Sequence, residues 1–157
     1  MNKKVSFYTL GCKLNFTETS TLKRYFEEKG FLPVNDSENP DIIVVNTCSV
    51  THQADRKSRQ YIRKMARRNP DAVMVVTGCY AQLKAEEIAE KEKVDYIFGS
   101  NEKLRILDIV PEFEKQTHPR IFTCPLKDID IFSPAYSSGE RTRSFLKVQD
   151  GCDYFCA

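Results

Sequence analysis

The sequence has no long hydrophobic run and little excess of charge of either sign. No stretch approaches the roughly 18 consecutive apolar residues of a membrane span, and the segment from Met1 to Leu10 is too short and too polar for a secretory signal. The 24 basic residues nearly balance the 22 acidic ones, giving a net charge of +2, which excludes a polybasic tail and an acidic disordered protein. We therefore expect a cytoplasmic protein without a membrane partner, in which any surface that binds nucleic acid is local.

Several common site signatures are also missing. No Gly-x-Gly-x-x-Gly follows the first apolar run, and no Gly-Lys-Ser/Thr occurs, which excludes the usual dinucleotide and phosphate loops. A response-regulator site would need carboxylates at the ends of the first and third strands. The chain has Gly11-Cys12 and Thr47-Cys48 at those places.

The arrangement of apolar residues predicts the fold. The 157 residues, 41% of them apolar, can build one domain-sized core. Up to about residue 110, short apolar runs alternate with amphipathic stretches, as in βαβ units around a parallel sheet. We predict a doubly wound α/β domain with a five-stranded parallel sheet, flavodoxin-like (order 2-1-3-4-5) in preference to Rossmann-like (3-2-1-4-5). The expected strands are 5–10, 31–34, 42–46, 73–77 and 96–98.

Helix-capping residues and stretches rich in Pro and Ser predict the helix ends and the domain boundaries. The first helix should have Asn15 as its N-cap, Glu18 as a capping-box partner and Gly30 as its stop. Residues 1–116 form the first predicted domain, 117–142 a linker rich in Pro and Ser, and 143–157 the start of a truncated second domain that opens with a strand at 144–149. The other helices are expected at 54–68, 84–93 and 102–114.

Three of the six cysteines directly follow apolar runs. Cys12, Cys48 and Cys79 come after the first, third and fourth expected strands, which are neighbours in the order 2-1-3-4-5, so their thiols can converge at one edge of the sheet. Three thiolates with an open coordination position suit an iron-sulfur cluster or zinc. His52, four residues after Cys48, is the candidate fourth ligand of a Cys3His zinc site, whereas His118 in the linker carries no site signal.

A further motif lies at the end of the chain. Cys152 and Cys156 form the opening of a Cys-x3-Cys-x2-Cys pattern. Together with Gly11–Asn15, Asn46–Val50 and Gly78–Gln82, these cysteines resemble the methylthiotransferases of the radical S-adenosylmethionine superfamily over essentially the whole chain.

This resemblance implies two clusters and a division of labour. Cys12, Cys48 and Cys79 match the ligands of an amino-terminal [4Fe-4S] cluster that presents sulfur. Cys152 and Cys156 match two ligands of a second [4Fe-4S] cluster, in a barrel domain, that cleaves S-adenosylmethionine. Because the third cysteine of that motif and the rest of the barrel are absent, we expect a fragment that is inactive by itself.

The resemblance also implies a substrate. Thr9–Lys13 and Arg56–Gln60 resemble the branch that inserts a methylthio group at C2 of N6-threonylcarbamoyladenosine at position 37 of tRNA. Isopentenyladenosine-37 tRNA and a ribosomal-protein aspartate remain alternatives. The implied partners are tRNA, S-adenosylmethionine and an electron donor such as flavodoxin or ferredoxin.

The competing hypothesis is that the protein is not an enzyme but a zinc-binding structural or interaction module. Cys124 is interpreted as a linker thiol without a ligand role.

A basic stripe lies on the helix expected at 54–68. Residues 56–68 hold seven of the 24 basic residues, and about 100° of rotation per residue brings four arginines onto one side of this helix. Tyr61, Ile62 and Met65 fall on the opposite side. The stripe is either a contact surface for tRNA phosphates or a solvated helix face. Its members are Arg56, Arg59, Arg63 and Arg67.

Overall fold

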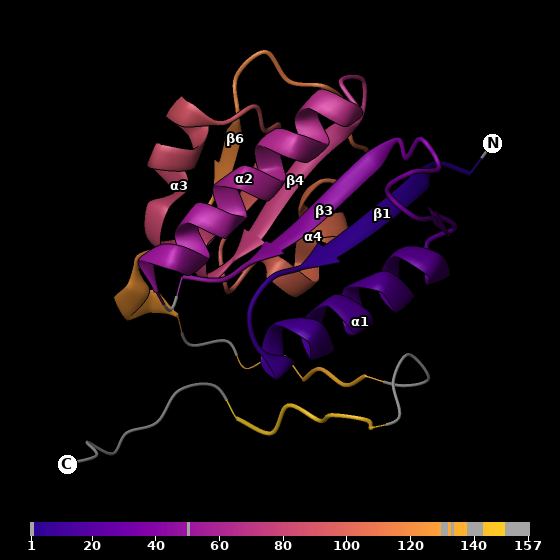
Figure 1. Cartoon of the computed structure of the whole chain (residues 1–157). Coiled ribbons are helices and arrows are strands. Elements are labelled where there is room, and N and C mark those ends of the chain that lie inside the picture. Colours follow the sequence, from indigo (N-terminus) through magenta and orange to yellow (C-terminus); the bar gives the residue numbers. More distant parts are fainter. Residues whose placement is uncertain (1, 50, 130–131, 133, 138–142, 150–157) are drawn as a thin grey trace.

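The computed structural model describes residues 2–49, 51–129, 132, 134–137 and 143–149, and it shows a parallel sheet between two layers of helices (Figure 1). The helices of the described part are α1 (Lys13–Glu28), α2 (His52–Arg68), α3 (Cys79–Lys91), α4 (Ile106–Ile109) and the 3-10 turns η1 (Lys103–Arg105) and η2 (Leu126–Asp128). The strands are β1 (Lys4–Thr9), β2 (Leu32–Pro33), β3 (Ile42–Thr47), β4 (Val73–Gly78), β5 (Tyr96–Phe98) and β6 (Arg120–Phe122).

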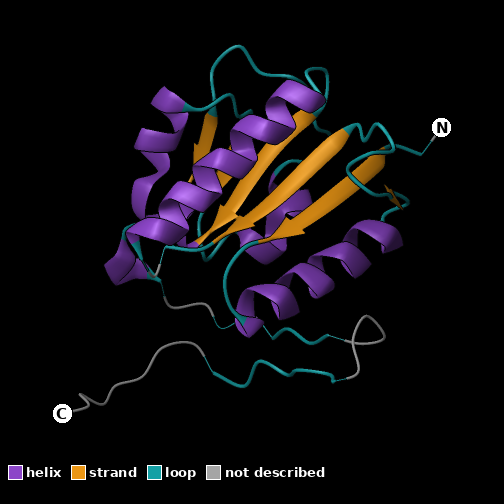
Figure 2. Cartoon of the chain, viewed as in Figure 1, coloured by secondary structure: helices purple, strands orange, loops and turns teal. Residues whose placement is uncertain are grey.

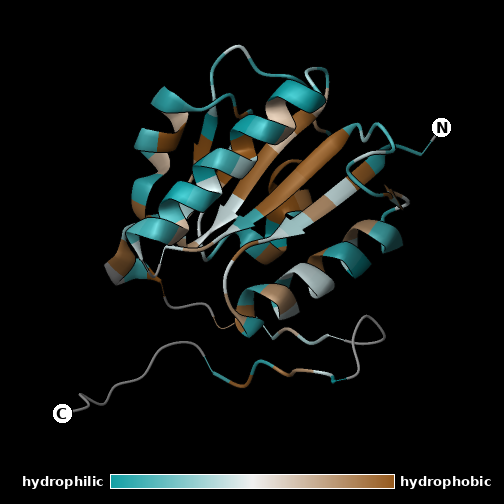
Figure 3. Ribbon diagram, in the orientation of Figure 1, coloured by the Kyte–Doolittle hydropathy of each residue, from teal (hydrophilic) through white to brown (hydrophobic). Residues whose placement is uncertain are grey.

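The central strands are buried on both faces. Every residue of β3, β4 and β5 is buried, which is why these strands are nearly continuous apolar runs. Leu22 and Phe26 of α1 pack on one face together with α4. Ile62 and Met65 of α2 pack on the other face together with α3. Figure 3 shows the resulting pattern of hydrophobic strands beneath helices with hydrophilic outer surfaces.

The strand order is β2-β1-β3-β4-β5-β6, so the predicted order 2-1-3-4-5 is confirmed. The predicted number of strands is one too low, because β6 pairs in parallel with β5. This strand is only three residues long and follows Thr117-His118-Pro119, so its sequence resembles a loop. It lies within 117–142, and the sheet therefore extends past the predicted domain boundary at 116.

The helix ends differ from prediction in physically clear ways. The N-cap of α1 is Cys12, not Asn15, because the Asn15 amide group bonds to two loops instead. The helix predicted from residue 84 begins at Cys79, and the backbone is non-helical at Lys84. The helix expected over 102–114 is reduced to η1 and α4, and Val110, which precedes Pro111, is no longer helical.

The chain beyond the sheet packs on α1. The strand expected at 144–149 is reduced, in the described residues, to one antiparallel bridge between Tyr136 and Leu146. Ala135 of the same segment is fully buried. Figure 1 shows the described part of this segment passing beneath the amino end of α1. None of the described helices is long and apolar enough to cross a membrane.

Candidate metal centre

The three predicted cysteines follow three neighbouring strands. Cys12 follows β1, Cys48 follows β3 and Cys79 begins α3 directly after β4, and these strands lie side by side with Thr9, Asn46 and Thr77 in register. All strands run in the same direction (Figure 2), so the three cysteines lie at one edge of the sheet. Cys12 and Cys79 are exposed, Cys48 is buried, and all three are free thiols.

Two glycines let the loops that carry Cys12 and Cys79 pack directly on the loop that carries Cys48. A Cβ on Gly11 would lie 2.6 Å from the Cβ and 2.9 Å from the Sγ of Cys48. A Cβ on Gly78 would lie 2.3 Å from the carbonyl oxygen of Thr47. Both glycines have a positive φ, +106° and +99°, which other residues rarely adopt. Gly11 therefore lets the Cys12 loop pack against the Cys48 side chain, and Gly78 lets the Cys79 loop pack against the backbone of Thr47.

A buried polar network holds the loops in register. Asn15 donates from Nδ2 to the carbonyl oxygen of Leu10 (2.8 Å), in the loop after β1, and to that of Thr47 (3.0 Å), the last residue of β3. Asn46 donates from Nδ2 to the carbonyl oxygen of Asn15 and to Oγ1 of Thr19. The Thr47 hydroxyl donates to the carbonyl oxygen of Thr77 at 2.6 Å. Because these groups are buried, breaking a bond would leave an unsatisfied polar atom, so the network favours one arrangement of the loops.

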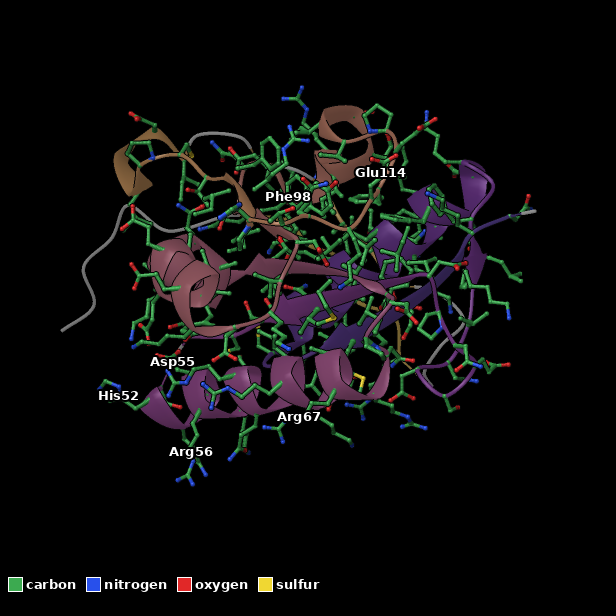
Figure 4. The ribbon with its side chains drawn as sticks, turned by 90° about the horizontal axis from the view of Figure 1, so that it is seen from above. His52, Asp55, Arg56, Arg67, Phe98 and Glu114 are labelled. Carbon is green, nitrogen blue, oxygen red and sulfur yellow. The ribbon has the colours of Figure 1, made fainter. Side chains whose placement is uncertain are left out.

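A second set of contacts holds the loop after Cys48. Asp55, buried in the first turn of α2, accepts a hydrogen bond from the Ser49 hydroxyl at 2.7 Å. Its other oxygen lies 3.3 Å from Nζ of Lys84, at the kink of α3. The Ser58 hydroxyl donates to the carbonyl oxygen of Cys48 at 3.4 Å. In Figure 4, Asp55 lies between α2 and α3. This carboxylate thus links the two helices that begin at the site.

The electrostatics at Cys79 involve both other thiols. Burial of the sulfur raises the pKa of the Cys79 thiol, although part of the residue is exposed to solvent. The nearby Lys103 ammonium group opposes this shift, whereas Cys48, Glu18 and Cys12 raise the pKa further. The Cys79 thiol therefore interacts electrostatically with both other thiols and with Lys103.

The described residues do not assemble a site for a single metal ion. Within the described ranges, no three or more His, Cys, Asp or Glu side chains are grouped so as to hold one metal ion. His52 is exposed on the first turn of α2 and extends outward (Figure 4), so the described residues do not form a Cys3His site. Zinc draws its thiolates to about 2.3 Å from one centre, whereas a [4Fe-4S] cluster binds each thiolate to a different iron, so its ligands are more widely spaced.

Over residues 4–99 the chain matches the uncharacterized protein family UPF0004. The chain belongs to this family. UPF0004 is the amino-terminal domain of the radical S-adenosylmethionine methylthiotransferases, and the resemblance predicted from the cysteine motifs is confirmed.

Relatives of this UPF0004 chain have named activities. The threonylcarbamoyladenosine tRNA methylthiotransferase MtaB of Aquifex aeolicus is 40% identical, over 98% of this chain and 38% of its own length. MtaB of Bacillus subtilis is 37% identical, over 97% and 34%. The ribosomal protein uS12 methylthiotransferase RimO of Lachnoclostridium phytofermentans is 32% identical, over 98% and 36%. The chain thus spans about a third of the length of these curated relatives.

The arginine stripe of this UPF0004 domain is not made of four free guanidinium groups. Arg63 forms two 2.8 Å hydrogen bonds with the buried carboxylate of Glu92. Arg59 lies 3.4 Å from Glu87 of α3. In the described part of the chain, Arg56 and Arg67 form no ion pair, and Figure 4 shows Arg56 extending away from the sheet. Two stripe residues therefore hold α2 and α3 together, and two remain available for a partner.

The structure describes one of the remaining three cysteines. Cys152 and Cys156 lie outside the described residues. Cys124 follows β6, and its Sγ accepts a 3.2 Å hydrogen bond from Asn101.

A charged group near the site is not predicted by the sequence. Glu18, the predicted capping-box partner, is instead buried and paired with Lys103 and Lys147. The available signal was its spacing: Glu18 lies four and eight residues before the buried Leu22 and Phe26, on the core side of α1.

Proposed function

We propose that this domain holds the auxiliary [4Fe-4S] cluster of a tRNA methylthiotransferase through Cys12, Cys48 and Cys79. The observation that carries the proposal is the convergence of three free thiols on three adjacent loops at one edge of the sheet. Family membership supports the same assignment. When bound, such a cluster supplies an iron with an open coordination position, where sulfur can be held for insertion into a C–H bond.

The residues of this chain would hold and orient that group. Gly11 and Gly78 let the cysteine loops touch, and Asn15 ties the first loop to the second. Burial raises the pKa of the Cys79 thiol, and the ammonium group of Lys103 opposes that shift. The amino ends of α1 and α3, at Cys12 and Cys79, add backbone N–H groups that favour negative charge.

The substrate we propose is N6-threonylcarbamoyladenosine at position 37 of tRNA, modified at C2. The MtaB names of two relatives at 40% and 37% identity support it. In the complete protein, Cys152 and Cys156 would belong to the second cluster, where S-adenosylmethionine is cleaved with an electron from flavodoxin or ferredoxin. We place the reaction in the cytoplasm, where tRNA is found.

A nucleoside assay tests the substrate. The complete protein that contains this sequence, reconstituted with iron and sulfide without oxygen and then reduced, should convert tRNA bearing N6-threonylcarbamoyladenosine-37 to its methylthio form, measured by mass spectrometry of digested tRNA. Isopentenyladenosine-37 tRNA and ribosomal protein uS12 are the matched alternative substrates. Modification of either of these, with none of the first, would overturn the substrate assignment.

The free arginines give a second expectation. Replacing Arg56 and Arg67 together with Gln should weaken tRNA binding and lower the slope of log affinity against log salt by somewhat under two units, since each phosphate contact contributes about 0.7–0.9. A salt series of binding measurements checks this. Replacing the exposed Lys4 and Lys29 with Gln removes the same charge away from α2 and is the control. Coincident curves for the arginine variant and the wild type would remove the RNA role from α2.

A further inference from the structure

One buried carboxylate is shared by two lysines from distant parts of the chain. Glu18 of α1 lies 2.5 Å from Nζ of Lys103 and 3.2 Å from Nζ of Lys147. All three side chains are only 5–6% exposed. Buried charges persist only when they are paired, and removing one partner is costly. Glu18 therefore fixes both lysines relative to α1.

The two lysines belong to different segments of the chain. Lys103 lies in η1, and its charge acts on the Cys79 thiol. Lys147 lies in the segment after the sheet and comes five residues before Cys152. Five residues span at most about 18 Å even when fully extended. Whatever fixes Lys147 thus limits how far Cys152 can lie from this domain.

Further contacts dock the same segment on α1. The Thr21 hydroxyl accepts a hydrogen bond from the backbone N–H of Tyr136 at 3.1 Å, and the Arg24 guanidinium group stacks on the Tyr136 ring at 3.9 Å. Two backbone bonds join the halves of the segment, from the Ser137 N–H to the Phe145 carbonyl (2.9 Å) and from the Lys147 N–H to the Ala135 carbonyl (2.8 Å). Among these contacts, the pair of Lys147 with Glu18 is the one buried ion pair.

We propose that Glu18 is a positioning residue that, through Lys147, holds the chain leading to Cys152 against the domain that carries Cys12, Cys48 and Cys79. The link to chemistry rests on the proposed function, because a fixed distance matters only if the two cysteine sites work together. The docking of this segment on α1 is inferred from the described contacts and does not depend on the proposed function.

Hydrogen exchange of the complete protein tests the docking. Replacing Lys147 with Met keeps the Glu18 to Lys103 pair, and the backbone amides of 136, 137 and 145 should exchange on the order of tenfold faster, while those of β3 and β4 stay unchanged. Lys103→Met is the matched control: it removes the other lysine and should leave those three amides unchanged. Lys147→Arg should restore slow exchange. Unchanged exchange in Lys147→Met would overturn the proposal.

The ratio of methylthiolated tRNA to deoxyadenosine tests whether this docking positions the two cysteine sites. In the complete enzyme, Lys147→Met should still cleave S-adenosylmethionine, measured as deoxyadenosine, but form roughly tenfold less methylthiolated tRNA per cleavage, because the sulfur-bearing site is displaced. Lys147→Arg should recover the ratio. An unchanged ratio alongside faster exchange would show that docking does not position the two sites. If the wild type forms no methylthiolated tRNA, the proposed function fails, and the exchange experiment still decides the docking.

Discussion

Replacing Gly78 with Ala should destabilise the protein by about 2–6 kcal/mol and disrupt the metal centre. Gly78 has φ +99° and ψ −168°, a region almost confined to glycine, where another residue costs about 1–3 kcal/mol. The added Cβ would also lie 2.3 Å from the Thr47 carbonyl oxygen and 2.6 Å from Oδ1 of Asn46. Relieving that overlap in a packed site costs about another 1–3 kcal/mol and moves Cys79 away from the Cys48 loop. Urea unfolding and iron content measure the two effects.

Gly30 is the matched control for this experiment. It also has a positive φ, +88°, but a Cβ there meets nothing within 4 Å. Gly30→Ala should therefore cost only the backbone strain, about 1–2 kcal/mol, and leave iron binding intact. Equal losses of stability for Gly30→Ala and Gly78→Ala would show that the contact with Thr47 contributes nothing.

The order of the central strands was predictable because it follows from periodicity and connection. β1, β3, β4 and β5 are apolar runs bounded by turns and separated by amphipathic segments, a pattern that requires few long-range details. The two edge strands were harder to predict. β2 has two residues, one of them Pro33, and β6 has three residues, beginning with Arg120. Edge strands are stabilised by pairing with a neighbour, which the local sequence does not record.

The site was predictable in its cysteines but not in its supporting residues. The sequence shows that each cysteine follows an expected strand. It also shows that Gly11-Cys12 and Gly78-Cys79 resemble motifs of the methylthiotransferases. The roles of Asn15 and Glu18 depend on partners far along the chain: Thr47 for Asn15, and Lys103 and Lys147 for Glu18. Local rules assigned both residues to a helix cap, because capping is the common local role of Asn and Glu at such spacing. The pairing of Arg63 with Glu92 was hidden for the same reason.

Loss of any one of the three site thiols has the largest expected effect. Cys12→Ala, Cys48→Ala and Cys79→Ala should each abolish a stable cluster, since three thiolates already leave one iron without a protein ligand. Cys124→Ala removes a thiol that bonds to Asn101 outside this set and should retain the cluster. A full complement of iron in Cys48→Ala would contradict the ligand assignment.

Metal analysis of the wild-type chain, reconstituted without oxygen in the presence of iron, sulfide and zinc together, tests the central claim most directly. We expect about four iron and four sulfide per chain, with visible absorption that oxygen bleaches. A stoichiometric zinc ion, with no sulfide and no oxygen-sensitive absorption, would contradict it.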